Sequence, residues 1–287
     1  MLPRYIQRRN PKHDLLLDDT FIISSNLING YELERVFGLR LNRLSQYLDW
    51  PDFQMLLPYS KKRRMYSQVP RLFYDAGSPV VLIREGRGCD GKLPRISVSL
   101  KQGVPDLRDL PYSNIYCDYN WYFDDYWFEQ DREENRGELV FPQLTDHQNL
   151  AYQEQIEKCP MPVGVHVRRG DFAALGMAAF PTKYRPVCKK VLDDYPNACF
   201  FVFSDNPNWC KAHASEMGLD LAAQTIYVEG NDHGRSYIDM QLMGMCRGLI
   251  HPEDSTFSRT ATWFSKDMKF RMEVESPRLE KNRENGQ

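Results

Sequence analysis

The feature that most constrains this chain of 287 residues is a regular alternation of short apolar runs and helix-forming segments in its second half. Each apolar run is typical of a buried strand, and each is followed by a segment with helix-capping residues or helical periodicity. Strands that alternate with helices in this way form βαβ units with a parallel sheet. We therefore expect an α/β fold here. The predicted strands are 163–167, 199–203, 225–228 and 248–250.

Helix boundaries are clearest around residues 206–218. Asn206 is a favourable N-cap, Pro207 fits the first helical position, and Gly218 stands where a helix would end. These signals predict one helix between the cap and the glycine. The other predicted helices are 182–195, then 237–247 with Ile238, Leu242, Met245 and Cys246 facing inward, and a last helix opened by Ser255 and Thr256.

Polar residues follow each of the four predicted strands. The carboxyl ends of parallel strands share one edge of a sheet, where open α/β sheets bind ligands, so we expect these residues to lie close together. Helix N-termini at this edge offer N–H groups to phosphate, and Arg168 and Arg169 add charge-assisted donors. The sequence therefore predicts an anionic, phosphorylated ligand. The residues are Arg168, Arg169, Gly170 and Asp171; Ser204 and Asp205; Asp232, His233 and Gly234; and Asp254, Ser255 and Thr256.

Composition argues against several other classes of protein. The 37 Lys and Arg residues are balanced by 39 Asp and Glu, a net charge of −2, which leaves no electrostatic footprint for nucleic acid. The basic residues at 61–64, 84 and 87 are interpreted as solvated loop charge. No apolar run is long enough for a membrane helix, and the N-terminus has no signal-peptide core. Seven cysteines without Cys-x-x-Cys spacing favour a reduced cytoplasm over a disulfide or zinc framework.

Residues 166–172 carry the most specific motif. Their sequence, His-Val-Arg-Arg-Gly-Asp-Phe, resembles the His-x-Arg-Arg-Gly-Asp-aromatic motif of the α-1,2-fucosyltransferases, glycosyltransferase family 11. Five further segments resemble blocks of the same family in the expected order, and together the blocks make a strong signal although each alone is weak. These segments are 30–33, 122–127, 203–211, 236–243 and 255–258.

The resemblance implies a GT-B-like α/β protein with two Rossmann-like halves, in which helices flank parallel sheets. Residues 1–150 would form the acceptor-side half and residues 151–287 the half that binds GDP-fucose. It also implies an inverting, metal-independent enzyme without a cofactor, which moves L-fucose to the 2-hydroxyl of a galactose-type acceptor, either an oligosaccharide or a lipid-linked glycan. The Asp-x-Asp spacing typical of metal-dependent transferases does not occur. A cytoplasmic protein with peripheral contact at the inner membrane face is expected.

Fucosyl transfer needs positive charge near the departing diphosphate. Arg168 is the first candidate for the β-phosphate, with Arg169 assisting it or supporting the loop. His166 would hydrogen-bond ribose or phosphate, and Asp171 is the nearest candidate for a general base, unless it pairs with Arg169. Asp205 is expected as a turn or cap residue, with a guanine contact as the alternative. Similarity to the family adds Asp239 as a nucleotide contact, and Ser255, Thr256 and Phe257 as residues that close on the phosphates.

The chain departs from the family pattern near both ends. It lacks the family's glycine-rich Gly-Gly-Leu-Gly-Asn-Gln loop and begins inside or just after the helix that follows it, so the first strand is expected to be missing. Asp254 replaces the usual Asn before Ser-Thr-Phe-Ser, with Arg259 as an offsetting charge, and no closing apolar strand is expected beyond Lys266. Two alternatives follow: a fucosyltransferase of another linkage, or a catalytically inactive nucleotide- or glycan-binding relative.

Other conspicuous residues have structural interpretations. The aromatic block at 120–128 is expected to pack in a core rather than to form a sugar platform. His233 and His251 are expected in loops, since neither has a partner at metal-ligand spacing. Asp239 lies on an apolar helix, where a buried carboxylate needs a partner.

Overall fold

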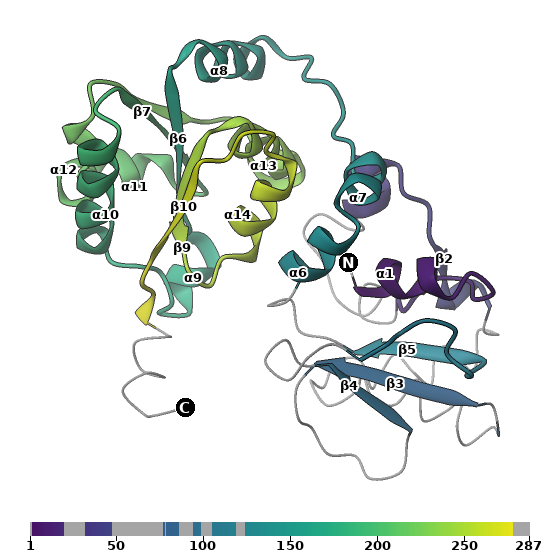
Figure 1. Cartoon of the computed structure of the whole chain (residues 1–287). Helices are drawn as coiled ribbons and strands as arrows, with labels where there is room; N and C mark the ends of the chain where they lie inside the picture. Colours follow the sequence, from purple (N-terminus) through teal and green to yellow (C-terminus); the bar gives the residue numbers. More distant parts are fainter. Residues whose placement is uncertain are drawn as a thin grey trace. The chain divides into compact units, whose positions relative to one another are not determined.

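The computed structural model describes residues 2–19, 32–47, 77, 79–85, 94–98, 105–118 and 124–277. They belong to two compact units, Met1–Val140 and Phe141–Gln287, each with a parallel sheet (Figure 1). The boundary expected at residue 150 falls inside helix α8, His147–Lys158, in the second unit. None of the helices within the described ranges is long and apolar enough to cross a membrane. Outside these ranges lie residues 30–31 and 122–123 of the family-like segments, residues 120–123 of the aromatic block and the basic residues at 61–64 and 87.

The second unit contains a five-stranded sheet in which every neighbouring pair of strands is parallel. Its strands are β6 Met161–Val167, β7 Ala198–Ser204, β8 Thr225–Val228, β9 Gly248–Pro252 and β10 Phe270–Val274. The order across the sheet is β8-β7-β6-β9-β10, so the chain starts at the centre, moves to one edge and returns beside its first strand. This doubly wound order has its switch point between β6 and β9. The predicted α/β fold class, with parallel sheets flanked by helices, is confirmed, and the four strands predicted from apolar runs are present.

Helices lie on both sides of this sheet (Figure 1). They are α8, α9 Gly170–Ala174, α10 Pro181–Asp194, α11 Pro207–Ala212, α12 Ala214–Met217, α13 Ser236–Met245 and α14 Thr256–Ala261. Val163, Val165 and Val167 of β6 share one buried core with residues of α10, α11 and α12. Phe201 and Phe203 of β7 share a second core with residues of α8, α13 and α14. Strands covered on both faces read as continuous apolar runs, which is why the sequence revealed them.

Strand β10 corrects the expectation that no strand follows Lys266. It pairs in parallel with β9 over all five of its residues. Its exposure alternates, with Arg271 and Glu273 exposed and Val274 buried. This alternation is typical of an edge strand that has one face on the core, and its charged residues conceal the strand from a search for apolar runs.

The helix predicted between Asn206 and Gly218 is in fact two helices. Asn206 Oδ1 accepts a hydrogen bond from the Trp209 amide at 3.1 Å and caps α11, which has Pro207 at its start. His213 forms the junction with α12, which ends at Gly218 with φ 75°, the left-handed conformation of a C-cap. Both predicted ends are confirmed, whereas the prediction of a continuous helix was wrong.

The first unit contains a three-stranded parallel sheet in the order β4-β3-β5 and a parallel pair, β1-β2. Its elements are α1 Leu2–Arg9, β1 Leu16–Leu17, α3 Glu32–Phe37, β2 Asn42–Arg43, β3 Val80–Glu85, β4 Arg95–Val98, β5 Asn114–Asp118, α6 Asp124–Gln130 and α7 Arg132–Glu138. Leu2 and Ile6 of α1 are buried in one core with Ile83, Leu107 and Trp127. Trp127 belongs to the aromatic block, so this part of the block packs in the core as predicted.

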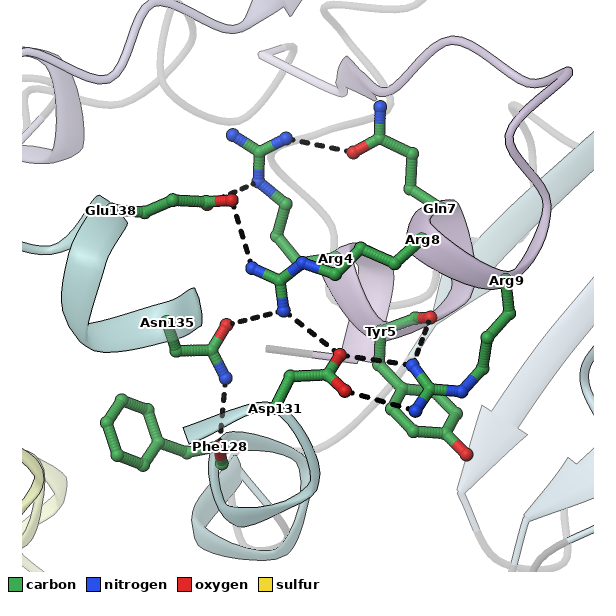
Figure 2. Close-up of polar contacts among 9 residues, drawn as sticks. All are labelled: Arg4, Tyr5, Gln7, Arg8, Arg9, Phe128, Asp131, Asn135 and Glu138. Atoms are coloured by element: carbon green, nitrogen blue, oxygen red, sulfur yellow. Dashed lines mark hydrogen bonds and ion pairs between the residues drawn. The ribbon is translucent and has the colours of Figure 1, made fainter. Parts of the chain in front are cut away.

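A cluster of charged side chains joins α1 to the α6–α7 segment (Figure 2). Asp131 accepts hydrogen bonds from Arg8 at 3.0 Å and from both terminal nitrogens of Arg9 at 3.1 and 3.0 Å. Arg8 also donates to Asn135 at 3.0 Å and to Glu138 at 2.9 Å. Burial alone would raise the pKa of Asp131, but the hydrogen bonds from Arg9 and Arg8 outweigh burial and lower that pKa. The cluster therefore fixes α1 on its own unit through ionised groups.

Candidate functional site

The turns after β6 and β7 start side by side at the carboxyl edge of the second unit's sheet. Val167, the last residue of β6, is in register with Ser204, the last residue of β7. Ser204 Oγ donates to the Val167 carbonyl at 2.7 Å and accepts from the Asn206 amide at 3.0 Å. These bonds fix the two strand ends from which the Arg-Arg-Gly-Asp turn and the Asp205 turn depart.

Arg168 lies between two carboxylates. Its guanidinium pairs with Asp171 at 2.8 Å and with Asp205 at 3.4 Å. The Arg168 side chain keeps 34% of its surface exposed, so a ligand can reach it. The alternative that Asp171 pairs with Arg169 was wrong, because the charged partner of Asp171 is Arg168.

Arg169 is held separately through its backbone and its side chain. Its amide donates to Asp205 Oδ1 at 2.8 Å, and its guanidinium carbon lies 3.9 Å from the centroid of the Trp209 ring. Asp205 therefore bridges the turns after β6 and β7. The helix cap that follows is supplied by Asn206, not by Asp205.

Gly170 leaves room for the Asp205 carboxylate. A Cβ atom at this glycine would lie 2.7 Å from Asp205 Oδ2, closer than a carbon and an oxygen can approach. A side chain at this position would therefore force the Asp205 carboxylate to shift from the place where it binds the Arg169 amide.

His166 is buried near the end of β6, with 4% of its surface exposed. Its Nδ1 lies 3.4 Å from Ser255 Oγ, and its ring centroid lies 5.7 Å from that of Phe257. Burial, reinforced by the charge of Arg168, lowers the pKa of His166 to about 3. The imidazole is therefore neutral near pH 7 and offers one donor and one acceptor nitrogen.

Ser255, Thr256 and Phe257 lie where β9 passes into α14. Ser255 is the buried N-cap residue, and its hydroxyl contacts His166 instead of capping the helix. Thr256 is the first residue of α14, and Phe257 packs on the core shared with α13. The structure therefore brings the start of α14 beside the end of β6, as the parallel sheet predicts.

The turn after β9 also differs from two expectations. Both carboxylate oxygens of Asp254 are buried without a hydrogen-bond partner among the residues that the structure describes, so the offset expected from Arg259 is not a hydrogen bond. His251, expected in a loop, is fully buried within β9, where its Nδ1 lies 2.9 Å from the Pro252 carbonyl oxygen.

Asp239 belongs to a separate network at the end of β8. Asn231 Nδ2 donates to Asp239 Oδ1 at 2.9 Å and to Asn149 Oδ1 at 2.8 Å, and Asn149 donates back to Asn231 at 2.9 Å. Asp146, the N-cap of α8, accepts from Asn149 at 3.0 Å and from Arg235 at 2.9 Å. Burial raises the pKa of Asp239 to about 7, and the bond from Asn231 only partly opposes this rise.

The sequence did not identify Asn149 and Asn231. The available signal was the carboxylate on an apolar helix, which predicted that Asp239 has a partner but not which residue it is. Asn149 lies on α8 and Asn231 in the loop after β8, 82 positions apart, so only the fold brings the two amides together.

The site combines two guanidinium groups, a neutral imidazole and exposed carboxylates at one edge of a parallel sheet. Guanidinium groups bind phosphate oxygens through paired, charge-assisted hydrogen bonds. A carboxylate within reach of solvent can accept a proton from a substrate hydroxyl. Within the described ranges, no group of three or more His, Cys, Asp or Glu side chains is placed to hold a metal ion.

Comparison with known families identifies the family of this chain. Residues 105–272 match the model of Glycosyl transferase family 11, and this match spans more than half of the 287 residues. The chain belongs to this family. The family 11 match includes every residue of the site described above, and it confirms the resemblance found in the sequence.

One curated relative of this family 11 chain is the alpha-1,2-colitosyltransferase of Escherichia coli, which is 28% identical over 130 residues. The aligned region is 43% of this chain and 43% of the relative, so the similarity spans less than half the length of either protein.

Two solved structures of fucosyltransferases are distantly similar. Fucosyltransferase NodZ from Bradyrhizobium gives a TM-score of 0.49 at 15% identity, and NodZ alpha-1,6-fucosyltransferase co-crystallized with GDP gives 0.48 at 16%. Each alignment covers 91% of this chain and 85% of the other. The α/β fold of this family 11 chain follows from the order of its own strands.

Proposed function

We propose that this family 11 chain is an inverting glycosyltransferase that moves L-fucose from GDP-fucose to the 2-hydroxyl of a galactose-type acceptor. The observation that carries the proposal is the position of Arg168 and Arg169 at the carboxyl end of the central strand β6. Open α/β sheets bind nucleotides at this edge beside the switch point, and two guanidinium groups there match a diphosphate.

Arg168 is the proposed ligand of the β-phosphate. Its guanidinium is paired with Asp171 and Asp205, whose side chains are 58% and 28% exposed. Asp205 is also bound to the Arg169 amide, so the more exposed Asp171 is the carboxylate that a phosphate would displace first. Donor binding would then neutralise the diphosphate and release Asp171.

Asp171 is the proposed general base. As the acceptor oxygen forms its bond to the anomeric carbon of fucose, its proton passes to the released carboxylate, and the bond from that carbon to the β-phosphate oxygen breaks. The bonding electrons leave with GDP, where Arg168 stabilises the added negative charge. Attack from the face opposite GDP inverts the configuration at the anomeric carbon.

The other residues complete the donor site in this proposal. Neutral His166 hydrogen-bonds ribose or phosphate, and Arg169 assists Arg168. Asp239 contacts the nucleotide from the network after β8, and Asp205 holds the turn, with a guanine contact as its alternative role. Ser255, Thr256 and Phe257 close on the phosphates where α14 begins.

Metal independence is part of the proposal, because the chain has no Asp-x-Asp spacing and its arginines supply the charge that a divalent cation otherwise supplies. We place the enzyme in the cytoplasm, with peripheral contact at the membrane face that holds lipid-linked acceptors. The acceptor would be a galactose-terminated oligosaccharide or lipid-linked glycan.

A second candidate differs in the donor sugar. The curated relative is an alpha-1,2-colitosyltransferase. This similarity supports colitose as the alternative donor sugar for this chain. A fucosyltransferase of another linkage and an inactive nucleotide- or glycan-binding relative are the remaining alternatives.

The test is a transfer assay with radiolabelled GDP-fucose and lactose as the galactoside, with and without EDTA, followed by NMR analysis of the linkage. We expect a 2-linked product that EDTA does not reduce and that Asp171→Asn nearly abolishes. Transfer only from GDP-colitose would select the second candidate. GDP binding without transfer from either donor would select the inactive relative, and product lost with EDTA would refute metal independence.

A further inference from the structure

Arg169, Trp209 and His213 form a stack beside the proposed donor site. The Arg169 guanidinium carbon lies 3.9 Å from the Trp209 ring centroid. The Trp209 and His213 ring centroids are 4.2 Å apart, and their planes are inclined by only 22°. A planar guanidinium at this distance from an indole ring is held by cation–π attraction and by stacking.

The Trp209 backbone is fixed on both sides. Its amide donates to the Asn206 side chain at 3.1 Å, and its carbonyl oxygen accepts from the His213 amide at 3.1 Å and lies 2.8 Å from His213 Nδ1. The next residue, Cys210, is completely buried in the core beneath. The ring is therefore a rigid surface on which a flexible arginine can be ordered.

Among the described residues, no hydrogen bond or ion pair competes with Trp209 for the Arg169 side chain. No nitrogen of its guanidinium donates a hydrogen bond to any residue that the structure describes, whereas its amide is bound to Asp205. Arg168 differs, because its charge is shared with Asp171 and Asp205. The ring thus orders the Arg169 guanidinium while it leaves the terminal N–H donors available.

We propose that Trp209 is a positioning residue for the donor: its ring holds the Arg169 guanidinium ready to bind the diphosphate of the sugar nucleotide. The inference rests on the proposed function and deepens it. The Arg169 guanidinium is then available to the diphosphate before the donor binds. The Arg168 guanidinium, in contrast, must first be released from a carboxylate when the donor binds.

The test is a double-mutant cycle read by calorimetric titration with GDP. The variants are Trp209→Met, Arg169→Ala and the double variant, with Trp209→Phe as the conservative change. Methionine fills the apolar volume without an aromatic face, which favours a folded protein. Tyr195→Met is the matched control, because Tyr195 is also a half-buried ring packed on the same core and stacked at 5.3 Å, on Phe270 of the edge strand. Thermal melts report the stability of each variant.

We expect Trp209→Met to weaken GDP binding about fivefold, a typical loss for one cation–π contact, and Trp209→Phe to restore most of it. In the Arg169→Ala background, Trp209→Met should cause no further loss. Tyr195→Met should lower the melting temperature and leave GDP affinity unchanged.

The inference is overturned if Trp209→Met weakens GDP binding by the same factor with and without Arg169, or if it leaves GDP affinity unchanged. Either result would leave the proposed donor site intact. Absence of GDP binding by the unmodified chain would overturn both. If Trp209→Met does not fold, the same cycle is run with Trp209→Leu, which also removes the aromatic face, and a loss that persists without Arg169 then overturns the inference.

Discussion

The Asp205 carboxylate accepts a hydrogen bond from the Arg169 amide at 2.8 Å and joins the turn after β6 to the turn after β7. The same carboxylate lies 3.4 Å from the Arg168 guanidinium, so one side chain fixes the backbone of one arginine and the charge of the other. It reaches both because Gly170 carries no side chain. In the Arg-Arg-Gly-Asp sequence the charged residues supply the chemistry, and the glycine supplies the space that the Asp205 carboxylate occupies.

Gly170→Ala should disrupt this arrangement. The added methyl group would meet Asp205 Oδ2 at 2.7 Å, so the carboxylate must shift, and we expect this shift to weaken its bond to the Arg169 amide. A hydrogen bond to a charged group contributes about 2 kcal/mol, and we expect GDP binding to weaken by at least about tenfold in calorimetric titration. Gly137→Ala is the control, because a Cβ at Gly137 meets no atom within 4 Å. Equal GDP affinity in the two variants would contradict this account.

Asp131→Asn should destabilise the first unit. Only 9% of the Asp131 side chain is exposed, and its loss of charge leaves Arg8 and Arg9 without their shared carboxylate. We expect the free energy of unfolding to fall by about 2 kcal/mol in urea denaturation followed by circular dichroism. Asp106→Asn removes a carboxylate from the exposed pair with Arg108 in the same unit and should change little. A comparable loss in both variants would show that the cluster has no special role.

Asp239→Asn should change how stability depends on pH. Burial raises the pKa of Asp239 from 3.8 to about 7, so between these values the folded protein binds a proton that the unfolded chain has lost. This group therefore costs the wild type stability as pH rises from about 4 to about 7. Asparagine keeps an oxygen acceptor for Asn231 but carries no charge. The free energy of unfolding of the variant, relative to that of the wild type, should therefore increase across that pH range. The measurement is urea denaturation at several pH values, and a difference that does not vary with pH would refute the prediction.

Asp254→Asn should stabilise the protein. Both Asp254 oxygens are buried without a hydrogen-bond partner among the described residues, and such unpartnered polar atoms are costly, more so in a carboxyl group than in an amide. The neutral amide has nearly the same shape, so we expect the melting temperature to rise by a few degrees, equivalent to about 1 kcal/mol. A lower melting temperature would mean that the carboxylate makes a stabilising interaction.

Much of the second unit was predictable because its information is local. Strands β6 to β9 are apolar runs covered on both faces, and the Asn206, Pro207 and Gly218 signals mark real helix ends. The topology then follows, since parallel strands bring their carboxyl ends to one edge. The arrival of Ser255 beside His166 is a consequence of that rule.

The features that could not be predicted from the sequence depend on contacts that only the folded chain makes. Arg271 and Glu273 gave β10 the appearance of a polar tail, although the strand completes the sheet. The partner of Asp171 was uncertain because both arginines are close in sequence, and only the backbone of the turn selects Arg168. The role of Trp209 was likewise invisible, since its ring meets Arg169 only when α11 is placed beside the end of β6.

Calorimetric titration of the intact chain with GDP, run beside Arg168→Ala and the exposed control Arg108→Ala, tests the central claim most directly. A donor site at the end of β6 predicts micromolar binding by the intact chain and by Arg108→Ala, and its loss in Arg168→Ala. Binding that survives in Arg168→Ala, or no binding by the intact chain, would contradict the assignment of this site to the diphosphate of a sugar nucleotide.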